Sequence, residues 1–406
     1  MLIPNNKTKL KDIFKLAGLP GYLLLGYYMI QFAFARAKVD ATAIDGSAIV
    51  FASYAMLCTY IGLKELSKNK YSRQFRKKML LGTPLKWFIY YTCFCLISAI
   101  WSSSFALTAY RAVECFGMLI IMSAAMKVLS ENTNNKGIVL WCVTYSFLML
   151  LFTFCSSLWQ TKNIGVTLYI CQFPSTIFFF LALYNAPNNI IRGFICIIAL
   201  LCKSTTGYIG IALGLVSLLF GNSKYRIWGI ILLITIGITS YLIGFENLLN
   251  NTVFASKGGF DYNNMSGRDV VWDNALQQMF LNHKEWSGYG FVAGERDFAI
   301  KWIGPQVIGM HNGYLSAFVG TGIIGFLLFS IFMISISLQT ISRKMPAEFK
   351  SLCIASIIVI NLHTFANPGL GFRVYGTWMP AMLLVNLICV LTIKKNSYDY
   401  NRNPSL

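Results

Sequence analysis

Long apolar stretches recur along the chain and are separated mostly by short polar connections. A helix of about 20 apolar residues crosses the hydrocarbon core of a bilayer, where lipid offers no hydrogen-bond partner to an open backbone. Each stretch is therefore expected to be a membrane-spanning helix. The stretches can be drawn at residues 17–36, 46–63, 85–103, 107–128, 137–158, 164–184, 188–203, 205–221, 226–244, 311–337, 349–365 and 374–393. The pattern predicts an all-α polytopic membrane protein with about 12 transmembrane helices, in which the seventh and eighth stretches could form one kinked element.

The composition agrees with this class. The chain has 406 residues, of which 56% are hydrophobic and only 12% are charged, about half the charged share of a soluble domain. The net charge of +19 comes mostly from basic residues in short connections, such as the run from Lys64 to Lys86. This distribution is typical of a membrane protein oriented by its cytoplasmic loops, and it also favours contact with anionic lipid. We expect both chain ends in the cytoplasm and no nucleic-acid partner.

One connection is much longer than the others. It spans residues 245–310, is rich in tryptophan and glycine, and shows helical periodicity through 270–281. A long loop in a compact protein is usually functional or disordered, and this composition favours an ordered extracytoplasmic loop. The chain is thereby divided into a first membrane region (1–244), a loop subdomain (245–310) and a second membrane region with a cytoplasmic tail (311–406).

The cysteine and histidine pattern bears on metals and disulfides. All 11 cysteines lie in or beside apolar stretches, and none lies in the long loop. Buried thiols that act as small apolar groups are therefore expected, rather than a disulfide framework. The three histidines form no Cys/His pair at ligand spacing, so neither a metal site nor a cofactor is expected.

Three segments of the loop carry candidate chemistry. Met265–Trp272 (MSGRDVVW) places Arg268 at a predicted helix start, where backbone N–H groups and a guanidinium both favour phosphate oxygens. Gly288–Phe291 (GYGF) is a turn where the backbone can approach a ligand closely. His311–Leu315 (HNGYL) runs into Gly320–Gly325 (GTGIIG), which predicts an imidazole at the outer mouth of a span above tightly packed helices. Such a histidine is suited to act as a general base near neutral pH.

The ordered set SGR-xxx-W, G-x-G, H-N-x-x-L and G-x-x-G resembles the O-antigen ligase and Wzy-type polymerase superfamily. The resemblance implies a GT-C-like, metal-independent glycosyltransferase in the bacterial inner membrane, with its active site facing the periplasm. The implied donor is a glycan on undecaprenyl diphosphate, and the acceptor hydroxyl displaces the lipid diphosphate with inversion. Carried over by motif, Arg268 would hold the diphosphate and His311 would activate or position the acceptor, with Asn312 and Tyr314 beside the substrate.

One stretch departs from the family pattern. Ligases of this superfamily often carry a Ser-Arg pair near the outer end of an earlier span, whereas Cys202–Gly207 reads CKSTTG. Lys203 could supply a point charge there, although it lacks the bidentate fork of an arginine. This form resembles the polymerase branch, which joins repeat units on the lipid carrier. The alternative is a ligase that transfers the glycan to lipid A–core; a chain-length regulator and a flippase are further expected partners.

Other ionisable residues lie near or within the spans. Arg111 and Glu114 are one turn apart in the fourth expected span, where a substrate contact and a helix-stabilising pair are both open. Arg373, near the outer start of the last span, could reach the lipid diphosphate or extend to the interface. His363 is interpreted as a packing residue and His283 as a surface residue. A transporter or flippase is the second alternative, but repeated halves and a midplane charge cluster are not detectable in the sequence.

Overall fold

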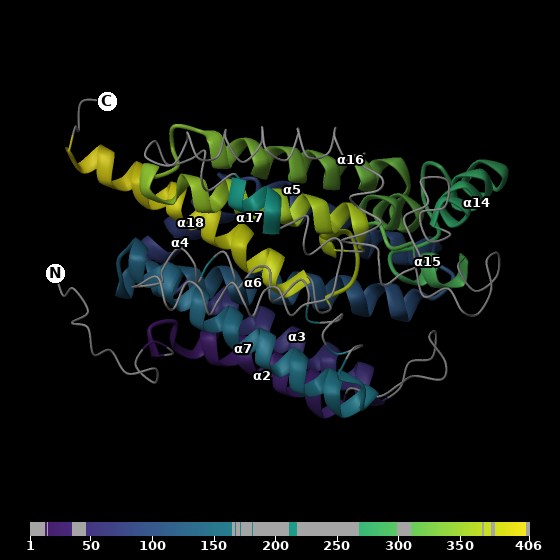
Figure 1. The fold of residues 1–406 in the computed structure, drawn as a ribbon, viewed down its shortest axis with the longest axis horizontal. Coiled ribbons are helices and arrows are strands. Elements are labelled where there is room, and N and C mark those ends of the chain that lie inside the picture. The colour runs from purple at the N-terminus through teal and green to yellow at the C-terminus, as the bar shows by residue number, and fades with distance from the viewer. Residues whose placement is uncertain are drawn as a thin grey trace, which may run out of the picture.

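The computed structural model describes residues 15–34, 46–164, 211–216, 268–298, 310–367, 369–374 and 378–402, together with Ile13, Thr167, Cys171 and Leu181. All regular secondary structure within these residues is helical, and the longer helices run along one common direction as a bundle (Figure 1). The all-α prediction is confirmed for this part of the chain.

Eight helices coincide with expected spans, and their bounds lie within a few residues of the apolar stretches in most cases. These are α2 (Gly18–Phe34), α3 (Gly46–Glu65), α5 (Leu85–Ile97), α6 (Phe105–Asn132), α7 (Asn135–Thr161), α16 (Gly313–Ile341), α17 (Ala347–Ala366) and α18 (Trp378–Arg402). Within the part of the chain that the structure describes, four helices are long and apolar enough to cross a membrane on their own, and a fifth crossing arises if one bent pair counts as a span. The protein is thus a multi-pass helical membrane protein. The four expected spans between 164 and 244 lie almost entirely outside the described residues, so about 12 spans remains a prediction.

The break in this bent pair lies in the connection that is expected to face the cytoplasm. Helix α4 (Lys70–Arg76) and the π-helical turn η1 (Lys77–Leu81) meet α5 with its 3₁₀ extension η2 (Ser98–Trp101) at an angle of 76°. The side chain of Asn69 caps α4 by accepting a hydrogen bond of 2.7 Å from the Ser72 amide. The basic run that the sequence places in a loop is therefore helical, and α4 lies at the opposite end of the bundle from α14 and α15 (Figure 1).

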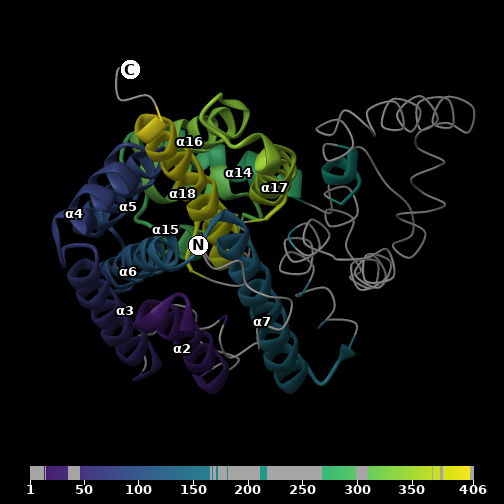
Figure 2. The ribbon, with the colours of Figure 1, turned by 90° about the vertical axis from the view of Figure 1, so that its left-hand side faces the viewer.

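Helix α6 forms the centre of the described bundle. It contacts α2, α3, α5, α7 and α18, several of which surround it in Figure 2. Most of its side chains between Leu107 and Ser130 are buried. Close approach to α3 depends on Gly117, because a Cβ at that position would lie 2.5 Å from the Ala55 carbonyl oxygen. Small residues allow such backbone contact between membrane helices. Helix α16 packs on the other side of α5 and against α17.

Two further helices come from the long expected loop. Helix α14 (Arg268–Leu281) confirms the periodicity seen at 270–281, and α15 (Ala293–Phe298) follows after a short connection. Residues 245–267 and 299–309 lie outside the described part of the chain. The sequence predicts one ordered loop across 245–310, whereas the structure describes only these two helices and the segment that joins them.

Candidate functional site at the outer ends of α5, α6 and α16

At the end of the bundle that the sequence predicts to face outward, here called the outer end, helix α14 is held against α16 and α17. The indole Nε1 of Trp272 donates a hydrogen bond of 2.8 Å to the Met310 carbonyl, and its ring meets the ring of Phe365 edge-on at 5.9 Å. In the segment that joins α14 to α15, the Tyr289 hydroxyl donates a hydrogen bond of 3.2 Å to the Gln278 carbonyl. Partial burial raises the pKa of Tyr289, so this hydroxyl keeps its proton at neutral pH. Trp272, the last residue of the SGR-xxx-W motif, thus has a definite structural contact.

The two glycine motifs contact each other. Gly322 interrupts α16 with φ 66°, and the Tyr289 and Gly290 amides donate hydrogen bonds of 2.9 Å each to the Val319 and Gly320 carbonyls. A Cβ on Gly288 would lie 2.6 Å from the Gly320 carbonyl oxygen. The turn therefore satisfies carbonyl groups that the kink leaves open. The sequence predicts that the backbone of Gly288–Phe291 can approach a ligand closely, whereas in the structure its close approach is to α16.

The same turn is anchored to the outer ends of α5 and α6. The Phe291 amide donates to Ser98 Oγ at 3.1 Å, and the Phe291 carbonyl accepts from Thr108 Oγ1 at 2.9 Å. The Trp101 indole donates to the Ser287 carbonyl at 2.7 Å. The segment between α14 and α15 therefore bridges α5 and α6 to the kink in α16. This bridge makes the outer end of the bundle a connected structure.

His311 directly precedes the N-cap of α16, at the helix end that the sequence predicts to face outward. Its backbone has φ 50°, in the left-handed region, and its side chain is half-buried. Asn312 is the N-cap of α16, since its Oδ1 accepts hydrogen bonds from the Tyr314 and Leu315 amides at 3.0 and 3.1 Å. On the other side, the Met310 amide donates to Glu295 Oε1 at 2.6 Å. The histidine is therefore held between a helix cap and a buried carboxylate contact.

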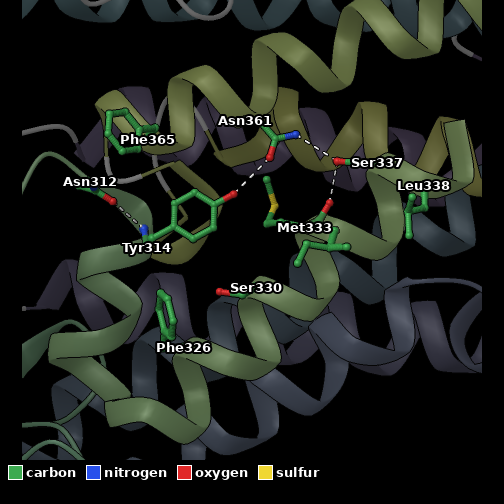
Figure 3. A pocket seen from close by; sticks show the side chains of 10 residues that line it. Asn312, Tyr314, Phe326, Ser330, Met333, Ser337, Leu338, Asn361 and Phe365 are labelled. Atoms are coloured by element: carbon green, nitrogen blue, oxygen red, sulfur yellow. Dashed lines mark hydrogen bonds between the residues drawn. The ribbon is translucent and has the colours of Figure 1, made fainter. Parts of the chain in front are cut away.

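A cavity of about 510 Å³ opens below this point, between α16 and α17 (Figure 3). Its wall is mostly apolar, and a chain of polar contacts crosses it. The Tyr314 hydroxyl donates to Asn361 Oδ1 at 3.1 Å, and Asn361 Nδ2 donates to Ser337 Oγ at 3.2 Å (Figure 3). Sequence reasoning missed Asn361, although an amide within an expected span is itself a signal of buried polar contacts. Tyr314 is thus tied to α17 beside the cavity.

Arg111 and Glu114 form a buried ion pair with partners beyond their own helix. Arg111 Nη1 lies 2.7 Å from Glu114 Oε2, and the two side chains are 11% and 1% exposed. Glu114 Oε1 also accepts from the Tyr27 hydroxyl of α2 at 2.7 Å and from the Tyr110 hydroxyl at 3.3 Å. The Arg111 guanidinium stacks over the Tyr110 ring at 4.5 Å, and its Nε has no hydrogen-bond partner among the described residues. The pair therefore joins α2 to α6.

The segment 369–374, which includes the 3₁₀ turn η5 (Gly369–Gly371), connects this ion pair to the start of α16. The Gly371 carbonyl accepts from the Tyr91 hydroxyl at 2.8 Å, and the Val374 carbonyl accepts from the Tyr27 hydroxyl at 3.5 Å. On its other side, Gly371 packs directly against the backbone of Gly313, leaving no room for a Cβ. Arg373 is half-buried, with its guanidinium 5.9 Å from the Phe372 ring and near enough to interact electrostatically with Tyr110.

Of the remaining residues singled out in the sequence, two are described only in part or not at all, and two are described fully. Arg268 is the first residue of α14, as predicted, but its side chain lies outside what the structure describes, and Lys203 lies outside entirely. His363 is 1% exposed within α17, and His283 is exposed, which agrees with their interpretation as packing and surface residues. Within the described ranges, no group of three or more His, Cys, Asp or Glu side chains is arranged to hold a metal ion.

Fold and site together define a multi-pass helical membrane protein in which α14, α15 and the turn between them are hydrogen-bonded to one end of the bundle. Residues 192–330 match the O-antigen ligase family model, so the chain carries an O-antigen ligase domain over that range. A search of curated proteins finds no match to the chain. The matched range contains α14, α15, His311 and the kink of α16, and it confirms the resemblance drawn from residues 266–325. Arg111, Glu114 and Arg373 lie outside it.

Proposed function

We propose that this protein is a metal-independent, inverting glycosyltransferase that polymerises oligosaccharide repeat units carried on undecaprenyl diphosphate. It would act at the periplasmic face of the bacterial inner membrane. The observation that carries the proposal is the position of His311 within the matched O-antigen ligase domain, at the end of a membrane helix and between two fixed neighbours. A base held in this way can meet a substrate whose lipid stays in the membrane and whose sugars lie outside.

In the proposed reaction, an acceptor sugar hydroxyl lies next to the imidazole of His311. Its oxygen attacks the anomeric carbon of the donor glycan while the imidazole accepts its proton. The bond between that carbon and the diphosphate oxygen breaks on the opposite face, so the configuration inverts. The electron pair leaves with the lipid diphosphate, whose developing charge requires cationic stabilisation. We assign that role to Arg268 at the start of α14, where helix N–H groups also favour phosphate.

Further cations would complete the diphosphate site. Arg373 is favoured because its segment packs against the start of α16 and against the Tyr27–Glu114 contact. Arg111 is favoured because its guanidinium has an unpartnered Nε among the described residues while Glu114 fixes its other edge. Lys203, in the position where related ligases often have an arginine, would add a point charge.

Two residues of the HNGYL motif are proposed substrate contacts on the acceptor side. Asn312 uses its carboxamide oxygen to cap α16, so its amide nitrogen is the group that would meet a sugar hydroxyl. Tyr314 lies beside the cavity between α16 and α17, with its hydroxyl on Asn361. Both residues lie within one turn of His311. This spacing supports the proposal that all three meet the same acceptor.

The alternative function is ligation of the finished glycan to lipid A–core, which shares the donor and the chemistry. Deletion of the gene in its host, followed by gel analysis of the surface glycan, separates the two. A single repeat unit on core indicates a lost polymerase, whereas long lipid-linked chains with bare core indicate a lost ligase. Bare core without any external lipid-linked glycan would instead indicate a flippase or transporter. An unchanged surface glycan would overturn all of these assignments.

A further inference from the structure

The backbone around His311 is held in an uncommon conformation. His311 has φ 50°, a region that residues other than glycine seldom adopt and that persists only where the surroundings enforce it. The residue before it supplies the enforcement. The Met310 amide donates to Glu295 Oε1 at 2.6 Å, and the Met310 carbonyl accepts from Trp272 Nε1 at 2.8 Å. Both polar groups of Met310 are thus bound by side chains of the external helices.

These two side chains are placed to act through the backbone rather than on a substrate. Glu295, on α15, is completely buried. Trp272, on α14, is partly buried and packs its ring edge-on against Phe365 of α17. The carbonyl that Trp272 binds belongs to the peptide bond leading into His311. Trp272 therefore contacts this peptide bond directly, whereas Glu295 can act on it only through the Met310 backbone.

Trp272 also connects His311 to the start of α14. Arg268 begins that helix and precedes Trp272 by four residues, which is about one helical turn. The hydrogen bond from Trp272 to Met310 consequently fixes the spacing between the helix start and the histidine backbone. Such spacing matters because groups in a transfer reaction must be placed closely, and a misplacement of about 1 Å can cost about 10²-fold in rate.

We propose that Glu295 and Trp272 are positioning residues that hold the backbone of Met310 on both sides of its Cα, and through it the peptide leading into His311, so that the imidazole faces the acceptor. Glu295 does so through the Met310 amide and Trp272 through the Met310 carbonyl. The inference rests on the proposed glycosyl transfer, because positioning has a kinetic meaning only for the histidine that acts in it. The presence of the two contacts themselves can be tested separately.

The kinetic test uses conservative substitutions at matched protein levels in purified membranes. Trp272→Phe keeps an aromatic ring and removes the N–H, and it should lower kcat by about 10- to 10²-fold while the KM for the lipid donor changes less than about twofold. Glu295→Ala should show the same pattern, and Glu295→Gln, which retains an acceptor oxygen, should recover most of the rate. Trp286→Phe is the matched control, because the Trp286 side chain is 65% exposed, and it should leave kcat unchanged.

A double-mutant cycle with His311→Ala separates positioning from a general structural role. If Trp272 acts through His311, adding Trp272→Phe to His311→Ala should change the remaining rate by less than about twofold. Independent, multiplying losses would overturn the positioning role. Equal kcat in Trp272→Phe and wild type would overturn it as well.

Hydrogen–deuterium exchange tests the contacts without any enzyme assay. In the purified full-length protein, peptides that contain Met310 should exchange slowly, and Glu295→Ala should speed exchange there by at least about tenfold, corresponding to the loss of about 1.4 kcal/mol of protection. Fast exchange at Met310 in the wild-type protein would overturn the proposal. Wild-type membranes that transfer no glycan would instead refute the proposed function, and the exchange result would still decide whether Glu295 holds this backbone.

Discussion

Substitution of Glu114 is expected to destabilise the bundle more than removal of either tyrosine hydroxyl that donates to it. The carboxylate is 1% exposed and serves Arg111, Tyr27 and Tyr110 at 2.7, 2.7 and 3.3 Å. Glu114→Gln removes the charge and leaves the Arg111 guanidinium, 11% exposed, without its counterion. Breaking a buried pair in this way typically costs about 3–5 kcal/mol. The change should therefore lower the free energy of unfolding by about that amount.

Removal of the Tyr27 or Tyr110 hydroxyl should cost less stability, and the cost should follow the length of each hydrogen bond to Glu114. Tyr27→Phe removes a short hydrogen bond to a charged acceptor and should cost about 1.5–3 kcal/mol. Tyr110→Phe removes a longer one, and should cost about 0.5–1.5 kcal/mol. Tyr60→Phe is the matched control, because Tyr60 lies on α3 with 65% of its surface exposed, and its change should be close to zero.

The assay is reversible unfolding in mixed micelles with a rising fraction of denaturing detergent, followed by circular dichroism and tryptophan fluorescence. The expected order of destabilisation is Glu114→Gln, then Tyr27→Phe, then Tyr110→Phe. The double variant Arg111→Met/Glu114→Gln should recover most of the lost stability, because it no longer buries an uncompensated charge. If Glu114→Gln costs under about 1 kcal/mol, the argument that this carboxylate compensates Arg111 fails.

The same double variant separates structure from substrate binding. It is expected to fold, and it lacks the cation that we propose for the donor diphosphate. Donor binding should therefore fall even though stability returns. Full glycan transfer by this variant would assign the pair a structural role only, which is the alternative that the sequence leaves open.

Three further predictions concern topology, metals and the two proposed catalytic groups. A reporter fused after Thr252 should read as external and one after Lys70 as cytoplasmic; a cytoplasmic signal from the first fusion would contradict the site assignment. Transfer in purified membranes should survive EDTA, and activity that is lost and then restored by Mg²⁺ or Mn²⁺ would count against the mechanism. Arg268→Lys should recover little donor binding or transfer relative to Arg268→Ala, since a point charge replaces a two-pronged donor. His311→Ala should keep donor binding and lose about 10²–10⁴-fold in transfer, and a wild-type rate in that variant would leave His311 a structural role.

The spans could be predicted because each depends on a long apolar window and little else. The stretch at 107–128 corresponds to α6 at Phe105–Asn132, and the stretch at 349–365 corresponds to α17 at Ala347–Ala366. The bend of 76° between α4 and α5 could not be predicted, because the basic side chains there indicate the cytoplasmic side and say nothing of the backbone path. A hydropathy pattern indicates which residues lie within the membrane, whereas the angle between α4 and α5 depends on how the turn between them packs.

The candidate site, too, could be predicted from the sequence only in part. His311 could be placed at a helix mouth because it stands at the start of the apolar stretch 311–337, a local signal. The pairing of Arg111 with Glu114 is also local, since the two lie one turn apart. The contact of Glu114 with Tyr27 joins residues 87 positions apart, and no spacing in the sequence marks it. Contacts of this kind arise from the packing of α2 on α6, so they needed the structure.

Rigidity at the outer end of α16 limits where acceptor choice can arise. Met310 is bound by side chains from α14 and α15, the kink at Gly322 is bound by the turn at Gly288–Phe291, and Gly371 packs against Gly313. The base that we propose is therefore held on three sides and has little freedom to follow different acceptors. Under the proposed function, a glycan chain and lipid A–core would be distinguished by the residues that bring the acceptor hydroxyl to His311. Exchange of those residues between polymerases and ligases should change the acceptor while leaving the histidine and its supports untouched.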